Sequence, residues 1–425
     1  MVTAHARSEK GSAHAGSEKG SAHAGASATP VLNPYDYDFH EDPYPFYRRL
    51  RDEAPLYHNE ELGFWALSRH ADVLRGFRNS VTLSNAEGVS LDPVSRGPHA
   101  AKTMSFLAMD DPGHLRLRTL VSKGFTPRRI RELEPRVTEL AVRHLDTMLA
   151  MAGSGTVDYV AEFAGKLPMD VISELMGVPE PDRARIRELA DGVMHREDGV
   201  TDVPASAIEA SINLMVYYKN MVAERRKKPA DDLTSALLNA EIDGDRLTDD
   251  EILGFMFLMV IAGNETTTKL LANAAFWGHK NPDQLTPVYA DPARVPLWVE
   301  ETLRYDTSSQ ILARTVSGEL TLYDTTIPVG DVLVLLPGSA HRDERVFDDP
   351  DSYLIGRDIG SKLMSFGSGA HFCLGAHLAR MEARVALVEL FKRIRRYEVD
   401  EANAIRVHSS NVRGFARLPI SVEVA

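Results

Sequence analysis

The chain has a single cysteine, Cys373, which lies in a glycine-rich segment directly before an apolar helical pattern. This segment constrains the fold most, because its glycines allow a tight turn in which the backbone can closely approach a flat ligand. At a helix start, the helix dipole and free N–H groups favour a thiolate, which suits a metal ligand. Most free cysteines are otherwise only small buried residues. The segment runs Phe366-Gly367-Ser368-Gly369-Ala370-His371-Phe372-Cys373-Leu374-Gly375.

The composition narrows the class of protein and its partners. Of the 425 residues, 44% are hydrophobic and 26% are charged, which predicts a globular protein with a large buried core. The formal net charge of -13 makes nucleic acid and anionic membranes unfavourable partners. One cysteine excludes an intramolecular disulfide and multi-cysteine zinc or iron–sulfur sites, and it fits a reducing cytoplasm.

The first 28 residues differ from the rest of the chain. They contain a perfect tandem repeat of Ser-Glu-Lys-Gly-Ser-Ala-His-Ala-Gly, at 8–16 and 17–25, and no apolar targeting segment. Such a small and polar tail is expected to be disordered. The longest apolar run, 252–263, is too short to cross a bilayer. We therefore predict a soluble, cytoplasmic protein with a disordered tail at 1–28 and a single folded domain at 29–425.

Hydrophobic periodicity predicts a mainly α-helical protein with a small β region. Helical spacing is found at 112–149, with Pro127 and Pro135 as punctuation, and in seven later segments. Strands are expected at 63–67 and within 311–334, a long loop at 84–109 and an Asp- and Pro-rich meander at 343–358. The later helical segments are 167–176, 182–194, 205–227, 232–239, 249–279, 295–305 and 374–395.

The longest predicted helix carries Ala262-Gly263-Asn264-Glu265-Thr266 near its middle. Glycine there costs about 1 kcal/mol relative to alanine, so it needs a reason. A mid-helix threonine can bend a helix, and a hydroxyl beside a carboxylate can relay protons. Spacing alone leaves two interpretations open: a proton-relay site or a kinked core helix.

The cysteine segment resembles the heme-binding signature of the cytochromes P-450, which is Phe, two residues, Gly, two residues, then Phe-Cys-Leu-Gly. The segment 262–266 is similar to the family motif (Ala/Gly)-Gly-x-(Asp/Glu)-Thr. The resemblance implies the cytochrome P-450 fold, with Cys373 ligating the iron of heme b and with Thr266 and Glu265 directing protons to reduced oxygen. It also implies heme contacts from Ala262, Gly263, Phe366 and Gly375.

Two further sets of residues match the family in order along the chain. Glu301 and Arg304 lie three residues apart on one helix face and are expected to pair with Arg357, although Tyr353 and Leu354 depart from the usual meander pattern. This trio is expected to hold the fold. The resemblance also implies a clamp for the two heme carboxylates, which need buried cations. The clamp residues are His114, Arg118, Arg314 and His371.

The resemblance also predicts partners. The basic segment, 112–131, carries six basic residues and no acidic one, and we expect it to dock an acidic ferredoxin that works with a ferredoxin reductase. Its basic residues are Arg116, Arg118, Lys123, Arg128, Arg129 and Arg131. The substrate pocket is expected around 84–109, 194–215, 255–259, 307–312 and 409–415. Within it we single out Phe255, Met256, Met259, Thr307 and Leu312, with hydroxyls of Thr307 and Ser308 near the substrate.

The predicted reaction is insertion of one oxygen atom of O2 into a small, largely apolar substrate. Epoxidation or oxidative coupling would use the same residues, so both stay open. A non-catalytic heme sensor or ligand carrier is a further alternative, and the complete acid–alcohol pair argues against it.

Overall fold

The computed structural model describes residues 31–153, 155–194 and 203–425. The expected disordered tail at 1–28 lies outside the described residues, as does part of the expected pocket segment 194–215. Among the described residues, no helix is both long enough and apolar enough to cross a membrane.

Helices make up most of the fold, as the sequence predicts. The α-helices are α1 (Tyr37–Glu41), α2 (Tyr44–Glu53), α3 (His70–Arg78), α4 (Ala100–Met104), α5 (Gly113–Ser122), α6 (Pro127–Ala152), α7 (Lys166–Met176), α8 (Arg183–Met194), α9 (Ala205–Lys227), α10 (Leu233–Leu238), α11 (Asp249–Lys280), α12 (Pro282–Ala290), α13 (Val295–Tyr305), α14 (Pro337–Ala340) and α15 (Ala376–Phe391). Pro127 lies in the first turn of α6, where its missing N–H costs nothing, and Pro135 lies inside that helix.

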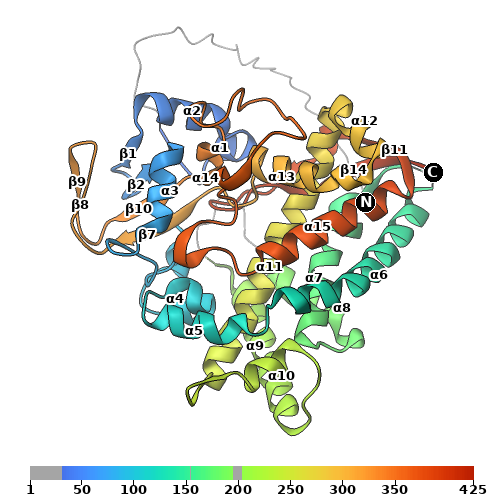
Figure 1. Cartoon of the computed structure of the whole chain (residues 1–425), viewed down its shortest axis with the longest axis horizontal. Helices are drawn as coiled ribbons and strands as arrows, with labels where there is room; N and C mark the ends of the chain where they lie inside the picture. Colours follow the sequence, from blue (N-terminus) through green and yellow to red (C-terminus); the bar gives the residue numbers. More distant parts are fainter. Residues whose placement is uncertain (1–30, 154, 195–202) are drawn as a thin grey trace, which may run out of the picture.

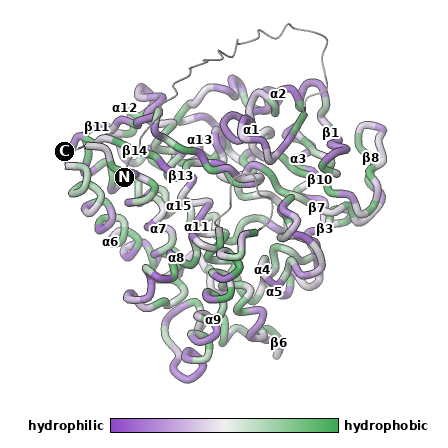
Figure 2. Tube along the Cα trace, turned by 180° about the vertical axis from the view of Figure 1, so that it is seen from behind, coloured by the Kyte–Doolittle hydropathy of each residue, from purple (hydrophilic) through white to green (hydrophobic). Residues whose placement is uncertain are grey.

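The longest helix, α11, organises the molecule. It begins with a capping box, in which the Thr248 side chain accepts from the Glu251 N–H and the Glu251 carboxylate accepts from the Thr248 N–H. Most of its residues are buried, and it packs against α7, α13 and α15 in the largest hydrophobic core. Figure 1 shows α11 in the middle of the molecule, between α6–α9 and the five-stranded sheet. The interior that it crosses is hydrophobic (Figure 2).

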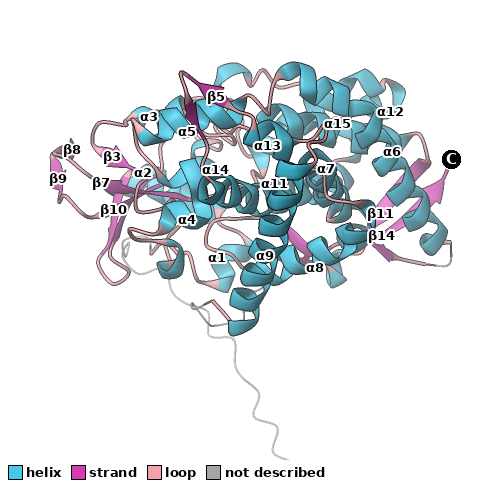
Figure 3. Cartoon of the chain, turned by 90° about the horizontal axis from the view of Figure 1, so that it is seen from below, coloured by secondary structure: helices cyan, strands magenta, loops and turns pink. Residues whose placement is uncertain are grey.

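The strands form two main sheets at opposite ends of the molecule (Figure 3). The larger sheet has the order β1-β2-β10-β7-β3 and the smaller one the order β11-β14-β4. In the larger sheet β10 runs parallel to β2 and antiparallel to β7, with Leu333 opposite Arg314. The strands are β1 (Leu56–Asn59), β2 (Phe64–Leu67), β3 (Leu83–Ser84), β4 (Val157–Asp158), β5 (Glu241–Ile242), β6 (Asp245–Arg246), β7 (Leu312–Val316), β8 (Leu320–Leu322), β9 (Thr325–Ile327), β10 (Val332–Leu335), β11 (Ile394–Val399), β12 (Ile405–Arg406), β13 (Phe415–Arg417) and β14 (Pro419–Val424).

Two segments differ from the sequence prediction. The expected loop at 84–109 contains α4 and two short 3₁₀ helices, Pro93–Ser95 and Ser105–Ala108. The expected helix at 374–395 begins only at Ala376 and ends at Phe391, and β11 follows it. The reason is tertiary: Ile394, Tyr397 and Val399 are buried, and β11 pairs antiparallel with β14 at the end of the chain. Periodicity within 374–395 could not reveal that partner.

Candidate functional site

Cys373 lies in a tight turn between a 3₁₀ helix, Gly369–His371, and the start of α15. The Cys373 N–H donates to the Phe366 carbonyl at 2.9 Å, which closes the turn. Gly367 and Gly369 have φ values of 69° and 74°, a region that glycine adopts without strain. At Gly375 a Cβ would meet only the Cys373 Sγ, at 4.0 Å. The backbone therefore leaves the sulfur open on that side.

The surroundings of the Cys373 sulfur shift its pKa in two directions. The Cys373 side chain is exposed, yet the protein that surrounds it desolvates the thiol and raises its pKa. Backbone N–H donation from Gly375 and Ala376 and the guanidinium charges of Arg118 and Arg380 lower it. These donors and cations stabilise an anionic sulfur, as expected at a helix start.

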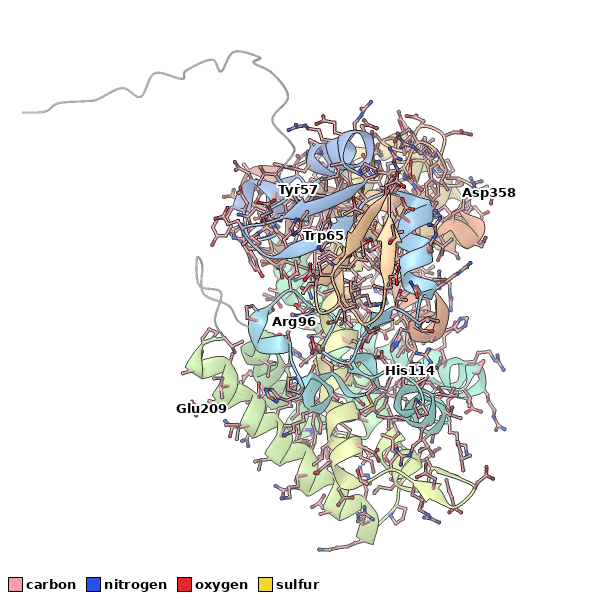
Figure 4. The ribbon with its side chains drawn as sticks, turned by 90° about the vertical axis from the view of Figure 1, so that its left-hand side faces the viewer. Tyr57, Trp65, Arg96, His114, Glu209 and Asp358 are labelled. Carbon is pink, nitrogen blue, oxygen red and sulfur yellow. The ribbon has the colours of Figure 1, made fainter. Side chains whose placement is uncertain are left out.

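Four expected clamp residues meet beside this turn. The rings of His114 and His371 lie with their centroids 4.0 Å apart. Arg118 donates to the carbonyl of Phe372, next to the cysteine, and Arg314 lies close enough for its charge to act on His371. Figure 4 shows His114 on α5, below the strands of the five-stranded sheet, which include the β7 strand of Arg314. The structure thus gathers residues from α5, β7 and the cysteine turn.

This clamp is short of negative charge: the Asp111 carboxylate lies 3.2 Å from His114 Nδ1, but among the described residues no carboxylate pairs with Arg118, Arg314 or His371. Arg314 is 4% exposed, and within 31–153, 155–194 and 203–425 it forms no ion pair; its side chain donates only to the Ala313 carbonyl. Burial lowers the Arg314 pKa to about 10. Burial, and then the charges of His114, Arg314 and Arg118, lower the His371 pKa to about 3. The His114 Nε2 and His371 Nδ1 atoms are buried without a hydrogen-bond partner among the described residues. The residues fit a buried ligand with carboxylates, such as the two of heme.

The middle of α11 has an open face. Ala262 is exposed and Met259 and Thr266 are partly exposed, although most residues of α11 are buried. These positions share one face because they are three and four residues apart. The Thr266 hydroxyl donates to the Ala262 carbonyl at 2.9 Å, and the Glu265 carboxylate pairs with Lys269 Nζ at 3.0 Å. The acid and the alcohol therefore stand side by side on a helix that keeps free surface.

Packing between two helices also explains why residue 263 is a glycine, besides the heme contact that the resemblance implies. A Cβ on Gly263 would lie 2.6 Å from Ile172 Cδ1 on α7. Glycine therefore permits the close approach of α7 and α11 behind Glu265 and Thr266.

The structure places the expected pocket residues in two different environments. Met259 and Leu312 are partly exposed, but Phe255 and Met256 are only 1% and 0% exposed. Helical geometry explains this difference from the expected pocket wall, because Phe255 and Met256 lie on the face of α11 that packs into the core, where Phe255 contacts Phe106 and Phe125.

The two hydroxyls expected near the substrate also face the protein. Thr307 is 1% exposed, and its hydroxyl is buried without a partner among the described residues. The Ser308 hydroxyl donates to the Thr266 carbonyl at 2.8 Å, so it ties the segment after α13 to the middle of α11.

The expected structural trio comes together. Glu301 and Arg304 are fully buried and form a two-pronged ion pair at 2.7 and 2.8 Å, and Arg357 Nε lies 3.4 Å from Glu301 Oε1. The departures from the usual meander pattern are accommodated: the Leu354 N–H donates to Glu301, and the Tyr353 hydroxyl shares a hydrogen bond with Thr302. The trio joins α13 to the meander before the cysteine turn.

The basic segment is less positive than the sequence indicates, because the fold brings carboxylates to it. The pairs are Arg116 with Asp245 and Glu251, Arg128 with Glu132, and Arg129 with Asp231. Lys123 donates to the Glu241 carbonyl. Arg131 is exposed and has no ion pair within the described ranges.

Two residues near the site escaped the sequence analysis. Lys269 could have been found, since it lies four residues after Glu265 and so shares its helix face. Arg380 lies 4.4 Å over the Phe366 ring and acts on the cysteine charge, but nothing in its local sequence distinguishes it from Arg384, the other arginine of α15.

Comparison with known proteins agrees with this fold. The family model described as Cytochrome P-450 matches residues 205–423. The cytochrome P-450 123 of Mycobacterium tuberculosis is 74% identical over 393 residues, which cover 92% of this chain and 97% of the relative. The monooxygenase PikC of Streptomyces venezuelae is 38% identical, with 90% and 92% covered. The structure of CYP109Q5 from Chondromyces apiculatus aligns with a TM-score of 0.85 at 33% identity, covering 94% of this chain and 100% of that one.

The helix-rich fold and the cysteine turn place this chain in the class of heme-dependent oxygenases. The chain belongs to the cytochrome P-450 family. It is therefore a cytochrome P-450 monooxygenase enzyme with a heme-iron cofactor.

Proposed function

We propose that this chain hydroxylates a small, largely apolar organic substrate in the cytoplasm, using heme b and electrons from a ferredoxin and its reductase. Residues 29–425 would form the catalytic domain. The clamp beside Cys373 supports the cofactor most directly, because Arg314 is a buried cation without an ion-pair partner among the described residues, and such a cation calls for a ligand that carries carboxylates.

In this proposal Cys373 is the iron ligand. The N–H groups of Gly375 and Ala376 favour the thiolate form of its sulfur against the effect of burial, and Arg118 and Arg380 add positive charge nearby. The four clamp residues orient the cofactor by its carboxylates, and Phe366 packs under Arg380 beside the turn. Bound heme would supply the activation of O2, which thiolate ligation promotes.

Thr266 and Glu265 would handle protons. The Thr266 Oγ1 holds its own proton toward the Ala262 carbonyl, so its lone pairs remain free to accept another hydrogen bond. Glu265 is the preceding residue, and in this proposal its carboxylate exchanges a proton with that hydroxyl by way of water. Ala262 is small and exposed, so it leaves room on the same face for O2 and substrate.

An apolar substrate is favoured by the pocket and by relatives. Met259 and Leu312 offer partly exposed apolar side chains on α11 and β7. A related structure, CYP109E1 from Bacillus megaterium, is known in complexes with corticosterone and with testosterone. We propose that the same kind of molecule, of moderate size and few polar groups, is turned over here.

The spectrum of the reduced, carbon-monoxide-bound protein tests the proposed iron ligand. We expect a strongly red-shifted Soret band, which Cys373→Ala should abolish while the protein still folds. An unshifted band in the heme-loaded wild-type protein would overturn the assignment. Product analysis with reduced ferredoxin and apolar test compounds then separates hydroxylation from epoxidation or coupling.

The proposed ferredoxin is tested by its rate of heme reduction. Since Arg128 and Arg129 already have carboxylate partners, Arg131→Glu should slow reduction more than Arg128→Glu does, and added salt should slow it in the wild type. If neither added salt nor charge reversal changes the rate of heme reduction, electrostatic docking at this segment is contradicted.

A further inference from the structure

Lys269 is the one lysine that is buried among the described residues, at 5% exposure. It lies in α11, one turn after Glu265 and Thr266. A buried ammonium group is costly unless it is paired and hydrogen-bonded. Its place beside the acid–alcohol pair therefore requires an explanation.

Two contacts fix the Lys269 ammonium group. It pairs with Glu265 Oε1 at 3.0 Å, and it donates to the Phe415 carbonyl at 3.0 Å. The Phe415 carbonyl belongs to β13, so the lysine is anchored outside its own helix. The Glu265 carboxylate is consequently held between α11 and the C-terminal part of the chain.

The path of the Lys269 side chain is also built into the fold. A Cβ on Gly414 would lie 2.6 to 2.8 Å from three methylene carbons of Lys269. Gly414 is thus the residue that lets the lysine stem pass under β13. The position of the ammonium group depends on backbone packing as well as on charge.

A second carboxylate acts on the pair from α8. Asp191 is in contact with solvent, yet the protein around it and the negative charge of Glu265 raise its pKa, while Lys269 opposes the shift. Lys269 therefore lies within the electrostatic range of two acids, one toward solvent and one beside Thr266.

We propose that Lys269 is a positioning residue for the proton-relay acid: it holds the carboxylate of Glu265, the residue before Thr266, at a fixed place, and so keeps its negative charge away from the open face of α11. The inference rests on the proposed roles of Glu265 and Thr266. Without the lysine, the carboxylate would turn toward the open face, where its charge would act on a diatomic ligand bound there.

The experiment uses the heme-loaded protein in its reduced form with carbon monoxide as the probe, and reads the C–O stretching band. A negative charge near the oxygen of bound carbon monoxide strengthens the C–O bond. Lys269→Met should therefore shift the band to higher frequency, and Lys269→Arg should restore it. Lys392→Met is the control, because Lys392 pairs with Glu389 at 2.6 Å at the end of α15, the opposite end of that helix from the cysteine turn; it should leave the band unchanged.

A double variant separates positioning from a structural role. In a Glu265→Gln background, Lys269→Met should produce no further shift, because no carboxylate remains to be released. A shift of equal size with and without Glu265 would overturn the proposal, and so would an unshifted band in Lys269→Met.

A second route covers the case in which Lys269→Met fails to bind heme. Gly414→Ala displaces the lysine stem and keeps its charge, so it should shift the band in the same direction. An unshifted band in that variant would overturn the inference. Each variant is first required to show the red-shifted Soret band: if the wild type lacks it, the proposed function fails, whereas a normal Soret band with an unmoved C–O band refutes only the role of Lys269.

Discussion

The imidazole rings of His114 and His371 lie 4.0 Å apart, one on α5 and the other two residues before the cysteine. Each ring has a buried nitrogen without a hydrogen-bond partner among the described residues. Two neighbouring rings of this kind, with Arg118 and Arg314 beside them, form a cradle for negative charge. Several measurable consequences follow from it and from the packing around it.

The heme-free protein should become less stable in mild acid because of His371. Its pKa is lowered to about 3 from 6.5, so between these values the unfolded chain binds a proton that the folded protein does not. Stability is therefore lost as the pH falls through this window, by at most about 1.4 kcal/mol per pH unit from this group. Denaturant unfolding at several pH values measures the slope, and His371→Gln should reduce it. An identical slope in the variant would contradict the prediction.

Arg314→Gln should have opposite effects on stability and on heme affinity. In the heme-free protein it removes a buried charge that lacks an ion-pair partner among the described residues, so the free energy of unfolding should stay equal or rise. Heme retention should weaken roughly 10- to 100-fold through loss of a charge-assisted hydrogen bond. Heme transfer to an acceptor protein measures the retention. Arg128→Gln, at an exposed pair, is the control and should change neither quantity.

Breaking the buried ion pair of Glu301 should destabilise the whole fold. Glu301→Gln leaves Arg304 and Arg357 without their carboxylate, which should cost about 3 kcal/mol or more. Glu53→Gln, which breaks an exposed pair with Arg49, should cost much less, because solvent screens that pair. Thermal unfolding of the two variants compares them directly. Equal losses of stability in the two variants would show that burial does not decide how much these ion pairs stabilise the fold.

Gly263 and Ile172 should be energetically coupled across α11 and α7. Gly263→Ala gains about 1 kcal/mol in helix propensity, but its Cβ meets Ile172 Cδ1 at 2.6 Å. Ile172→Val removes that carbon atom. We therefore expect Ile172→Val to destabilise the wild type and to stabilise the Gly263→Ala variant. Additive effects in the double-variant cycle would show that the two residues do not interact.

Residues close together in the chain were enough to predict the fold class and most of the candidate site. The capping residues and apolar run predicted α11, and the cysteine segment with its two left-handed glycines predicted the turn. Glu301 and Arg304 could be placed together because three residues separate them on one helix. These features are local, so the chain order alone contains them.

Contacts between segments far apart in the chain could not be predicted from the sequence. Residues 394–399 form a strand because the C-terminal β14 lies beside them, and the charge of the basic segment is offset because the β5–β6 segment and α11 bring Asp245 and Glu251 to Arg116. Phe255 and Met256 point into the core because neighbouring elements occupy that side of α11. In each case the decisive partner lies far away in the chain.

The sequence by itself determined that a cysteine turn and an acid–alcohol pair would be present and that Glu301 and Arg304 would share a helix face, since each depends on residues that are close in the chain. Only the tertiary structure decided which charges remain available. It offset much of the charge of the basic segment, left the His114–His371 cradle short of negative charge, and placed a buried lysine against Glu265. The physical reason is that the effect of a charge depends on its burial and on its partners, and folding sets both.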